Sequence, residues 1–346
     1  FLTAINYFFP IPKELQVYAA IGIVFVWYVL SNFNISLTGA LSNIFFFSMV
    51  AISLVVATVF FTNPNWTMAN ITAHGGFFPK GTSGIFVAMA VFSLKFIGFE
   101  MTPTMIEEVN FPVKKMGTVI LSALFIPAVL YAIVVLAMGG LAPWEEIAKM
   151  GMPEPELVHK LGLPGVIAIL AIFAGVLHAL TTLMGFWTSS ARVLYGAAQL
   201  NQLPKFFQKL NSHGQPYLSN LTVLIFSVFF CIFTGDNWVQ YIYAVSCIAA
   251  GVVYLFCCLD ALVLRKKHPE WNRPYRYPGE TLIPVLGSLI SIWIIIGSML
   301  ELPIGGYVSL AIYFAIGLVP PVLMGFYRKM NPKEHALVCL TPDDIN

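Results

Sequence analysis

The sequence predicts an all-α integral membrane protein with nine transmembrane helices, and three observations support this expectation. Hydrophobic residues make up 58% of the 346 residues and charged residues only 10%, whereas a soluble domain carries about 25% charged residues. Nine apolar stretches each supply the roughly 20 residues that a helix needs to cross a bilayer. Lysine and arginine are concentrated in alternate connections between these stretches, as expected of a chain that crosses a membrane repeatedly.

Each expected helix is a mostly apolar run that ends where polar, glycine or proline residues gather. Three connections are long: residues 63–82 are rich in Asn, Pro, Gly and Thr, residues 141–162 are acidic and contain Pro153 and Pro155, and residues 265–280 are basic. Such segments favour turns over helix. The nine expected helices span residues 15–33, 36–62, 83–108, 116–140, 163–196, 216–234, 238–264, 281–300 and 306–327.

The lysine and arginine count predicts the orientation. With the first connection, near residues 32–34, in the cytoplasm, thirteen of the eighteen Lys and Arg residues fall on the cytoplasmic side and four on the other, while Lys95 lies in the membrane. Cytoplasmic loops carry such an excess of positive charge. We therefore expect a multi-pass protein of the cell membrane (plasma or inner) with a cytoplasmic C-terminus. An odd number of spans places Phe1 outside, which favours the absence of N-terminal helices from this sequence.

The third stretch contains the most informative residues. Lys95 and Glu100 place two ionisable groups at mid-span, Gly98 lies between them, and Thr102-Pro103 weakens the helix that follows. Charge is costly inside a bilayer and is usually functional there. An intramembrane charge beside a Gly/Pro interruption is typical of a discontinuous helix that lines a binding cavity.

Three motifs resemble those of amino-acid permeases in the amino acid–polyamine–organocation (APC) superfamily. The motifs follow the family's order, each at a flank that is expected to be cytoplasmic. They are FIGFE at residues 96–100 with EEV at 107–109 and Pro112, similar to the sixth helix; ARVLY at 191–195 with LPKFF at 203–207, similar to the end of the eighth helix; and RPYRYPG at 273–279, similar to the loop before the eleventh.

The resemblance implies a LeuT-type inverted-repeat transporter bundle, in which the nine helices correspond to helices 4–12 of twelve and the first three are absent. The whole chain, residues 1–346, would form a single transmembrane transporter domain. Residues 1–82 would be the end of the first repeat, with two helices and an outer loop; residues 83–264 the second five-helix repeat; and residues 265–346 the last two helices and a cytoplasmic tail. The chain departs from the family pattern at Lys95, which leaves the substrate open.

An amino-acid substrate, as the resemblance implies, would bind around the third stretch. Its ammonium and carboxylate both need partners in a low dielectric. Unwinding at Gly98 would free carbonyl groups for the ammonium and N–H groups for the carboxylate; alternatively, Gly98 only permits close helix packing. The expected substrate-binding residues are Ser93, Lys95, Phe96, Ile97, Gly98, Phe99 and Tyr243.

Four residues are candidates for gating or proton coupling. Glu100 would take up a proton during transport, or else cap the half-helix. Lys95 would pair with Glu100, receive the substrate carboxylate or replace a coupling cation, or else extend into a water-filled vestibule. His178 would titrate near neutral pH or form an interhelical hydrogen bond. Trp187 is the fourth: like Tyr241 and Tyr243, it would close over the substrate or else belong to an aromatic belt at the membrane interface.

Thr181 and Thr182 are a candidate cation site. The resemblance supports this role, because hydroxyl groups of the corresponding helix help to hold a cation in sodium-coupled relatives of the fold. In membrane helices, however, such hydroxyl groups commonly bond back to carbonyls of their own helix.

Other functional classes lack their sequence features. The sequence contains no GxxxxGK[ST] loop, no nucleophile motif in context and no residues at metal-ligand spacing. We expect the five cysteines to be small apolar side chains rather than disulfides or a metal site. We therefore expect no metal, no cofactor, no enzymatic activity and no nucleic-acid partner.

The sequence as a whole predicts a secondary active transporter that moves amino acids by alternating access, as a proton-coupled symporter or an amino-acid exchanger. A polyamine or amine exchanger, in which Glu100 holds a substrate cation, is the alternative. An integral-membrane enzyme or a channel is disfavoured, because the intramembrane charges are few and concentrated in one segment. The expected partners are a small amino acid or amine and the lipid bilayer, with the chain acting alone or as a homodimer.

Overall fold

The structure is a computed structural model of the 346-residue chain. It describes residues 2–33, 35–73, 75–76, 78–104, 111–232, 236–273, 277, 279–300 and 302–341. Every regular element within these residues is a helix, and the all-helical class expected from the sequence is therefore confirmed.

Among the described residues, eight helices are long and nine helical elements are short. The long helices are α2 (Lys13–Ser31), α3 (Ile35–Phe61), α7 (Met116–Gly139), α10 (Gly165–Gln199), α11 (Tyr217–Ile232), α12 (Asp236–Lys267), α13 (Leu282–Leu300) and α14 (Ile304–Met330). The short elements are α1 (Leu2–Phe8), α4 (Met68–Thr72), α5 (Gly81–Phe92), α6 (Met101–Thr104), α8 (Trp144–Ile147), α9 (Pro153–Lys160) and the 3-10 helices η1 (Ser93–Phe96), η2 (Val113–Lys115) and η3 (Lys205–Gln208).

Seven of the described helices are long and apolar enough to cross a membrane: α2, α3, α7, α10, α12, α13 and α14. The other two expected spans are also helical, but shorter, with apolar runs at Gly81–Ala90 in α5 and Tyr217–Cys231 in α11. Large apolar side chains such as Phe125 and Val129 of α7 remain well exposed, as expected where lipid replaces water. The membrane class is thus supported, and nine spans stays a prediction.

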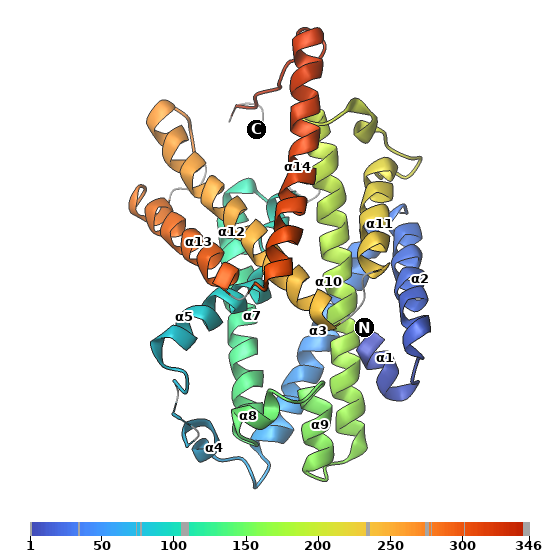
Figure 1. Cartoon of the computed structure of the whole chain (residues 1–346), viewed down its shortest axis with the longest axis vertical. Helices are drawn as coiled ribbons and strands as arrows, with labels where there is room; N and C mark the ends of the chain where they lie inside the picture. Colours follow the sequence, from blue (N-terminus) through green and yellow to red (C-terminus); the bar gives the residue numbers. More distant parts are fainter. Residues whose placement is uncertain are drawn as a thin grey trace.

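The bundle is built around α10, the longest helix, which runs through the middle of the molecule (Figure 1). α3 packs against α10 in the lower half of the view. α2 and α11 form one packed pair, and α12 and α13 form another on the opposite side of α10. α5 packs against α13, and η1 against α12. The segment that carries the expected site therefore meets helices from distant parts of the sequence.

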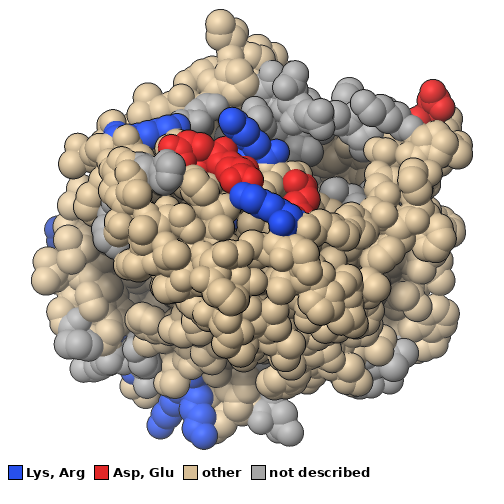
Figure 2. Space-filling view, turned by 90° about the horizontal axis from the view of Figure 1, so that it is seen from below, with Lys and Arg blue, Asp and Glu red and all other residues tan. Residues whose placement is uncertain are grey.

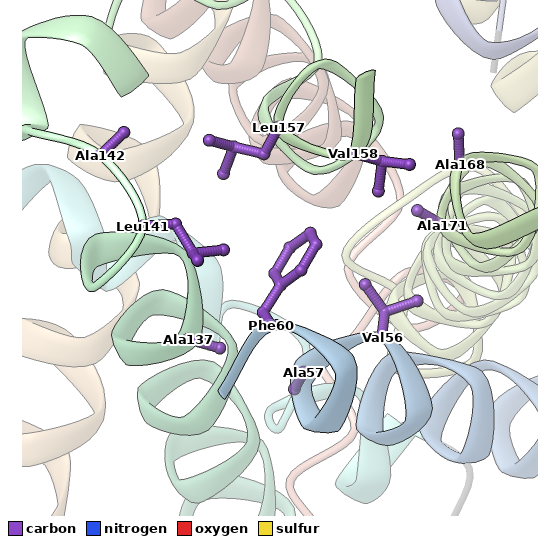
Figure 3. Packing of buried hydrophobic residues seen from close by; sticks show 10 residues of the cluster. All are labelled: Val56, Ala57, Phe60, Ala137, Leu141, Ala142, Leu157, Val158, Ala168 and Ala171. Atoms are coloured by element: carbon purple, nitrogen blue, oxygen red, sulfur yellow. The ribbon is translucent and has the colours of Figure 1, made fainter. Parts of the chain in front are cut away.

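The largest buried cluster lies where α3, α7, α9 and α10 meet. Phe60 of α3 is 1% exposed and lies at its centre (Figure 3), with Leu157 and Val158 of α9 on one side and Leu141, just after α7, on another. Val56 and the alanines at positions 57, 137, 142, 168 and 171 complete the cluster. Small residues let membrane helices approach closely, so this cluster fixes α3 and α7 against α10.

The connection after α3 is fastened to the end of α7. The Trp66 indole donates to the Leu136 carbonyl at 3.3 Å, and the Asn70 side-chain amide donates to the Gly140 carbonyl at 2.7 Å. The Thr67 N–H donates to the same Gly140 carbonyl at 2.9 Å. A Cβ at Gly140 would lie 2.0 Å from Trp66 Nε1, so only glycine fits beneath this indole.

The two ends of the bundle carry different charge. The last turn of α12 contains three basic residues and that of α14 two, and α14 ends at the top of Figure 1. Figure 2 shows the opposite end, where acidic side chains gather beside basic ones. α8 and α9 lie at this end and contribute four glutamates, one of which, Glu146, pairs with Lys160 at 2.6 Å. Burial raises the pKa of Glu154 in the first turn of α9. The membrane orientation stays a prediction.

Candidate functional site

The helix expected at residues 83–108 is interrupted. α5 ends at Phe92, η1 continues to Phe96, residues 97–100 form turns, and α6 begins at Met101. The predicted discontinuity is therefore present, at the position of the FIGFE motif. Residues 105–110, which include Glu107 and Glu108, lie outside the described residues.

Gly98 has the backbone conformation that breaks the helix. Its φ is +133°, in a region that residues with a side chain rarely adopt. Among the described atoms, a Cβ at this position would meet only Met101 Cε, at 3.9 Å. Glycine is therefore required by the backbone conformation rather than by lack of space, which favours unwinding over close packing as its role.

Glu100 folds back onto the break. The Gly98 N–H donates to Glu100 Oε2 at 2.8 Å, so the carboxylate caps a backbone group that the unwound helix leaves without a helical partner. This is the capping arrangement that the sequence left open as an alternative. It also means that the Gly98 N–H is already engaged and is not offered to a substrate carboxylate in this conformation.

α12 contributes Tyr254 to the same place. The Phe99 and Tyr254 rings lie 5.4 Å apart, tilted by 31°. The Tyr254 hydroxyl oxygen is buried and interacts electrostatically with Glu100. No described group meets hydrogen-bond geometry with this hydroxyl. A small shift of either side chain would therefore bring a phenol into contact with the carboxylate.

α7 holds the other side of the break. The Tyr131 hydroxyl donates to the Lys95 carbonyl at 3.2 Å. The Phe96 ring packs against Tyr131 at 5.9 Å and against Phe92 at the same distance. The Ser93 hydroxyl donates to the Ala90 carbonyl of α5 at 2.6 Å. η1 is thus fixed to α7 by one aromatic side chain.

α10 packs closely against α6. A Cβ at Gly185 would lie 3.5 Å from Met101 Sδ, and the Thr104 and Ser189 hydroxyl oxygens are 3.1 Å apart. The Thr104 hydroxyl donates to the Met101 carbonyl at 2.7 Å, so Ser189 is the donor to Thr104. This interhelical hydrogen bond ties the end of α6 to the C-terminal third of α10.

Three further expected residues lie on α10. His178 is within electrostatic range of Lys95. The Thr181 hydroxyl donates to the carbonyls of Leu177 and His178 at 3.1 and 2.9 Å, the back-bonding that competes with a cation role. Thr182 is exposed. The structure therefore brings His178 near the break but gives the threonine pair no shared geometry that favours a cation.

Trp187 lies in the interior between α10, α11 and α2. It is 2% exposed, packs with Trp27, Met184 and Leu224, and its indole donates to Asn220 Oδ1 at 3.1 Å. This place suits packing better than closure over a substrate. Tyr243 belongs to α12, and its side chain lies outside the described residues.

The break is therefore surrounded by residues that the sequence did not single out for the site. Tyr131, Tyr254 and Thr104 come from three different helices, and each is a polar group within an apolar segment. Such groups are a general signal of function or of interhelical hydrogen bonding in membranes. Within the part of the chain that the structure describes, no group of three His, Cys, Asp or Glu residues is placed to hold a metal.

Comparison with known proteins adds the family. The model of the family described as "Amino acid permease" matches residues 1–330. The chain is 26% identical to the methylthioribose transporter of Bacillus subtilis (strain 168), over 70% of this chain and 50% of the relative. It is 27% identical to the gamma-aminobutyric acid permease of the same organism, over 70% and 54%, and 24% identical to its branched-chain amino acid permease, over 82% and 57%.

These relatives are permeases and transporters rather than enzymes, in agreement with the expectation from the sequence. The chain spans about half the length of the curated relatives that it matches. Because the family model covers nearly the whole chain, through all the apolar helices, the chain belongs to the amino acid permease family of the APC superfamily.

Proposed function

We propose that this chain belongs to a secondary active transporter that moves amino acids across the cell membrane by alternating access. The observation that supports this most is the helix break at residues 97–100, centred on Gly98 with φ +133°. Discontinuous helices of this kind form substrate sites in transporters built from inverted repeats. Relatives named for amino acids, such as the branched-chain amino acid permease, support the substrate class.

The break offers the groups that a substrate ammonium needs. η1 ends at Phe96 and α6 begins only at Met101, so the carbonyl groups of residues 96 and 97 lie outside a continuous helix. We place the ammonium against the backbone of residues 96–98, with the aromatic rings of Phe96 and Phe99 excluding water. The aromatic neighbours Tyr131 and Tyr254 hold these two rings from α7 and α12.

The substrate carboxylate needs a different partner, because Glu100 occupies the Gly98 N–H. Lys95 is the cationic side chain nearest in sequence to the break, and its side chain is exposed. We assign Lys95 to the substrate carboxylate, either directly or through a vestibule. His178, which interacts electrostatically with Lys95, then influences how strongly that ammonium attracts an anion.

Glu100 is the group that we propose for proton coupling. Its carboxylate bonds to the backbone of the break itself, so protonation would weaken that hydrogen bond and alter the conformation of the site. A proton taken up here would be linked directly to opening or closing of the broken helix. If the protein is instead an exchanger, Glu100 acts only as the cap.

The wider architecture follows from the same proposal. Residues 1–82 would end the first repeat, residues 83–264 would form the second repeat, and residues 265–346 would supply two further helices and a tail. The basic ends of α12 and α14 would face the cytoplasm. The Ser189–Thr104 contact would then lie inside the second repeat, where it couples α10 to the site.

Uptake by proteoliposomes that contain the complete protein tests the proposal. Labelled amino acids and amines would be compared in empty vesicles and in vesicles preloaded with the same compound, at acidic and at neutral external pH. Uptake into empty vesicles that follows the pH gradient supports proton symport, and uptake that requires preloading supports exchange. Selective uptake of polyamines would instead favour the amine exchanger, and no uptake of any amino compound by folded protein would contradict the proposal.

A further inference from the structure

Residues 331–341, called the strap here, leave α14 and turn back across the end of α10. The strap begins with a turn in which the His335 N–H donates to the Asn331 carbonyl at 3.2 Å. It then continues without regular secondary structure. The family match ends at residue 330, where α14 ends, so the strap lies beyond the part of the chain that the family describes.

Three contacts hold the strap to the segment that follows α10. The Val338 N–H donates to the Leu200 carbonyl at 3.3 Å. The Asn201 side-chain amide donates to the Ala336 carbonyl at 2.8 Å. Lys205 at the start of η3 pairs with Glu334 at 3.4 Å. The contacts follow each other along both segments, so the strap lies alongside residues 200–205.

The strap completes the C-terminal cap of α10. The last carbonyl groups of a helix lack intrahelical partners. The Val338 N–H is such a partner for the carbonyl of Leu200, the C-cap residue. Asn201 follows with φ +56°, the left-handed conformation that commonly ends helices and that Asn tolerates better than most residues. The same Asn201 side chain then reaches the strap.

The Asn201–Ala336 and Lys205–Glu334 contacts of the strap are exposed. All its described residues except His335 are exposed, including the apolar side chains Leu337, Val338 and Leu340. The Lys205–Glu334 pair is exposed on both sides, and such pairs contribute little to stability. Segments held mainly by exposed hydrogen bonds open locally at low cost. The strap can therefore be released without unfolding the bundle.

α10 connects the strap to the proposed site. Ser189, eleven residues before Leu200, is hydrogen-bonded to Thr104 of α6 at 3.1 Å, and these eleven residues span roughly 16 Å of helix. A restraint on the end of α10 therefore acts on the same rigid helix that borders the break. Alternating access requires such a helix to move relative to its neighbours.

We propose that the strap restrains the cytoplasmic end of α10 by linking it to α14, and that release of the strap speeds the transport cycle. This inference rests on the proposed transport function. Through the contacts between residues 334–338 and residues 200–205, the strap lowers the turnover rate and leaves substrate affinity unchanged. Loss of one net hydrogen bond corresponds to roughly a fivefold shift in the balance between bound and released strap.

The sharpest test is the substitution Asn201→Gly in the complete protein. Glycine suits φ +56°, so the helix end is preserved while the amide that binds Ala336 is removed. We expect the maximal exchange rate in proteoliposomes to rise about two- to tenfold with an unchanged KM. Gln199→Ala is the matched control, because the Gln199 amide donates to Tyr195 within α10, and its rate should equal that of the parent protein.

Four further variants separate release of the strap from other effects of Asn201→Gly. Ending the chain after Asn331 should raise the rate at least as much. Lys205→Glu and Glu334→Lys should each raise it, and the double exchange of charges should return it towards the parent value. Amide hydrogen exchange at residues 197–203 should be faster in each strap-releasing variant, which measures the contact without any transport assay.

Three results would overturn the inference. Unchanged amide exchange after truncation would show that the strap does not bind α10. Faster amide hydrogen exchange with an unchanged transport rate would show that the contact does not restrain the transport cycle. A slower transport rate would show that the strap assists the cycle. Failure of the parent protein to carry any amino compound would contradict the proposed function instead. The amide hydrogen exchange data would still show whether the strap binds α10.

Discussion

The backbone N–H of Gly98 donates a hydrogen bond to the carboxylate of Glu100 across the break between η1 and α6, at 2.8 Å. Gly98 adopts φ +133°, which turns the chain so that a side chain two residues later can reach back to it. The residue that breaks the helix is therefore bonded directly to the residue proposed to carry a proton. A change in charge at Glu100 therefore acts directly on the backbone of the site, with no other side chain in between.

Glu100→Gln should separate the charge of Glu100 from its role as a cap. The Gln carbonyl oxygen can still accept from the Gly98 N–H, so the break should persist. Without an ionisable carboxyl group, uptake should lose its dependence on external pH if Glu100 couples a proton. The measurement is the initial uptake rate over a range of external pH. A pH profile identical to that of the parent protein would remove the coupling role.

Glu100→Ala is the companion variant, since alanine loses both charge and cap. The Gly98 N–H would then lack its partner, at a cost of about 1–3 kcal/mol where water cannot replace it. We expect lower thermal stability and lower uptake than for Glu100→Gln. Equal stability of the two variants would show that the hydrogen bond does not hold the break.

Gly98→Ala should abolish most transport through backbone strain. The Cβ itself meets only Met101 Cε at 3.9 Å among the described atoms, but holding a residue other than glycine at φ +133° costs about 1–3 kcal/mol. We expect uptake to fall roughly tenfold or more. Gly175→Ala on α10 is the control, because no described atom lies within 4 Å of the added Cβ. An equal loss of uptake in both variants would indicate general damage to the protein structure instead.

Trp187→Phe should lower stability while leaving substrate affinity unchanged. The indole of Trp187 is 2% exposed and donates to Asn220 Oδ1 at 3.1 Å; removal of this donor weakens a buried polar junction by about 1–3 kcal/mol. Thermal unfolding in detergent measures the loss, and uptake kinetics measure KM. A raised KM at unchanged stability would support the gating role that the sequence suggested.

Gly140→Ala should destabilise the connection between α3 and α4. The added Cβ would lie 2.0 Å from Trp66 Nε1, and the ring cannot shift without losing its bond to Leu136. Overpacking of this kind costs about 1–3 kcal/mol. Gly139→Ala is the neighbouring control, since its Cβ would meet Ile71 at an ordinary 3.6 Å. The midpoint of thermal unfolding should fall for the first variant and stay near the parent value for the second.

Glu154→Gln should stabilise the protein in a pH-dependent way. Burial raises the pKa of Glu154, so the folded state favours the protonated carboxyl group. Stability is then full below the pKa of the unfolded chain and declines as the pH rises through the folded pKa. Replacement by neutral Gln should raise the unfolding midpoint at neutral pH and change it little at acidic pH. A stabilisation that is equal at both pH values would contradict this cause.

The sequence determined the class of protein and the place of the break. Hydrophobic runs of membrane length and the alternation of basic connections depend only on neighbouring residues and on the bilayer. Within the described residues, each of the nine expected stretches accordingly contains a helix, and the third is interrupted at residues 97–100. Gly98 also acts locally, because its unusual φ requires only the absence of a side chain. These features can be predicted from single segments.

The tertiary structure decided which side chains meet at the break. Tyr131 reaches the Lys95 carbonyl across 36 residues and Ser189 reaches Thr104 across 85, and no local pattern marks either pair. The same holds for the strap, where Asn201 meets Ala336 across 135 residues. Such contacts depend on how whole helices pack, because each side chain gains a partner only after distant segments have been brought together.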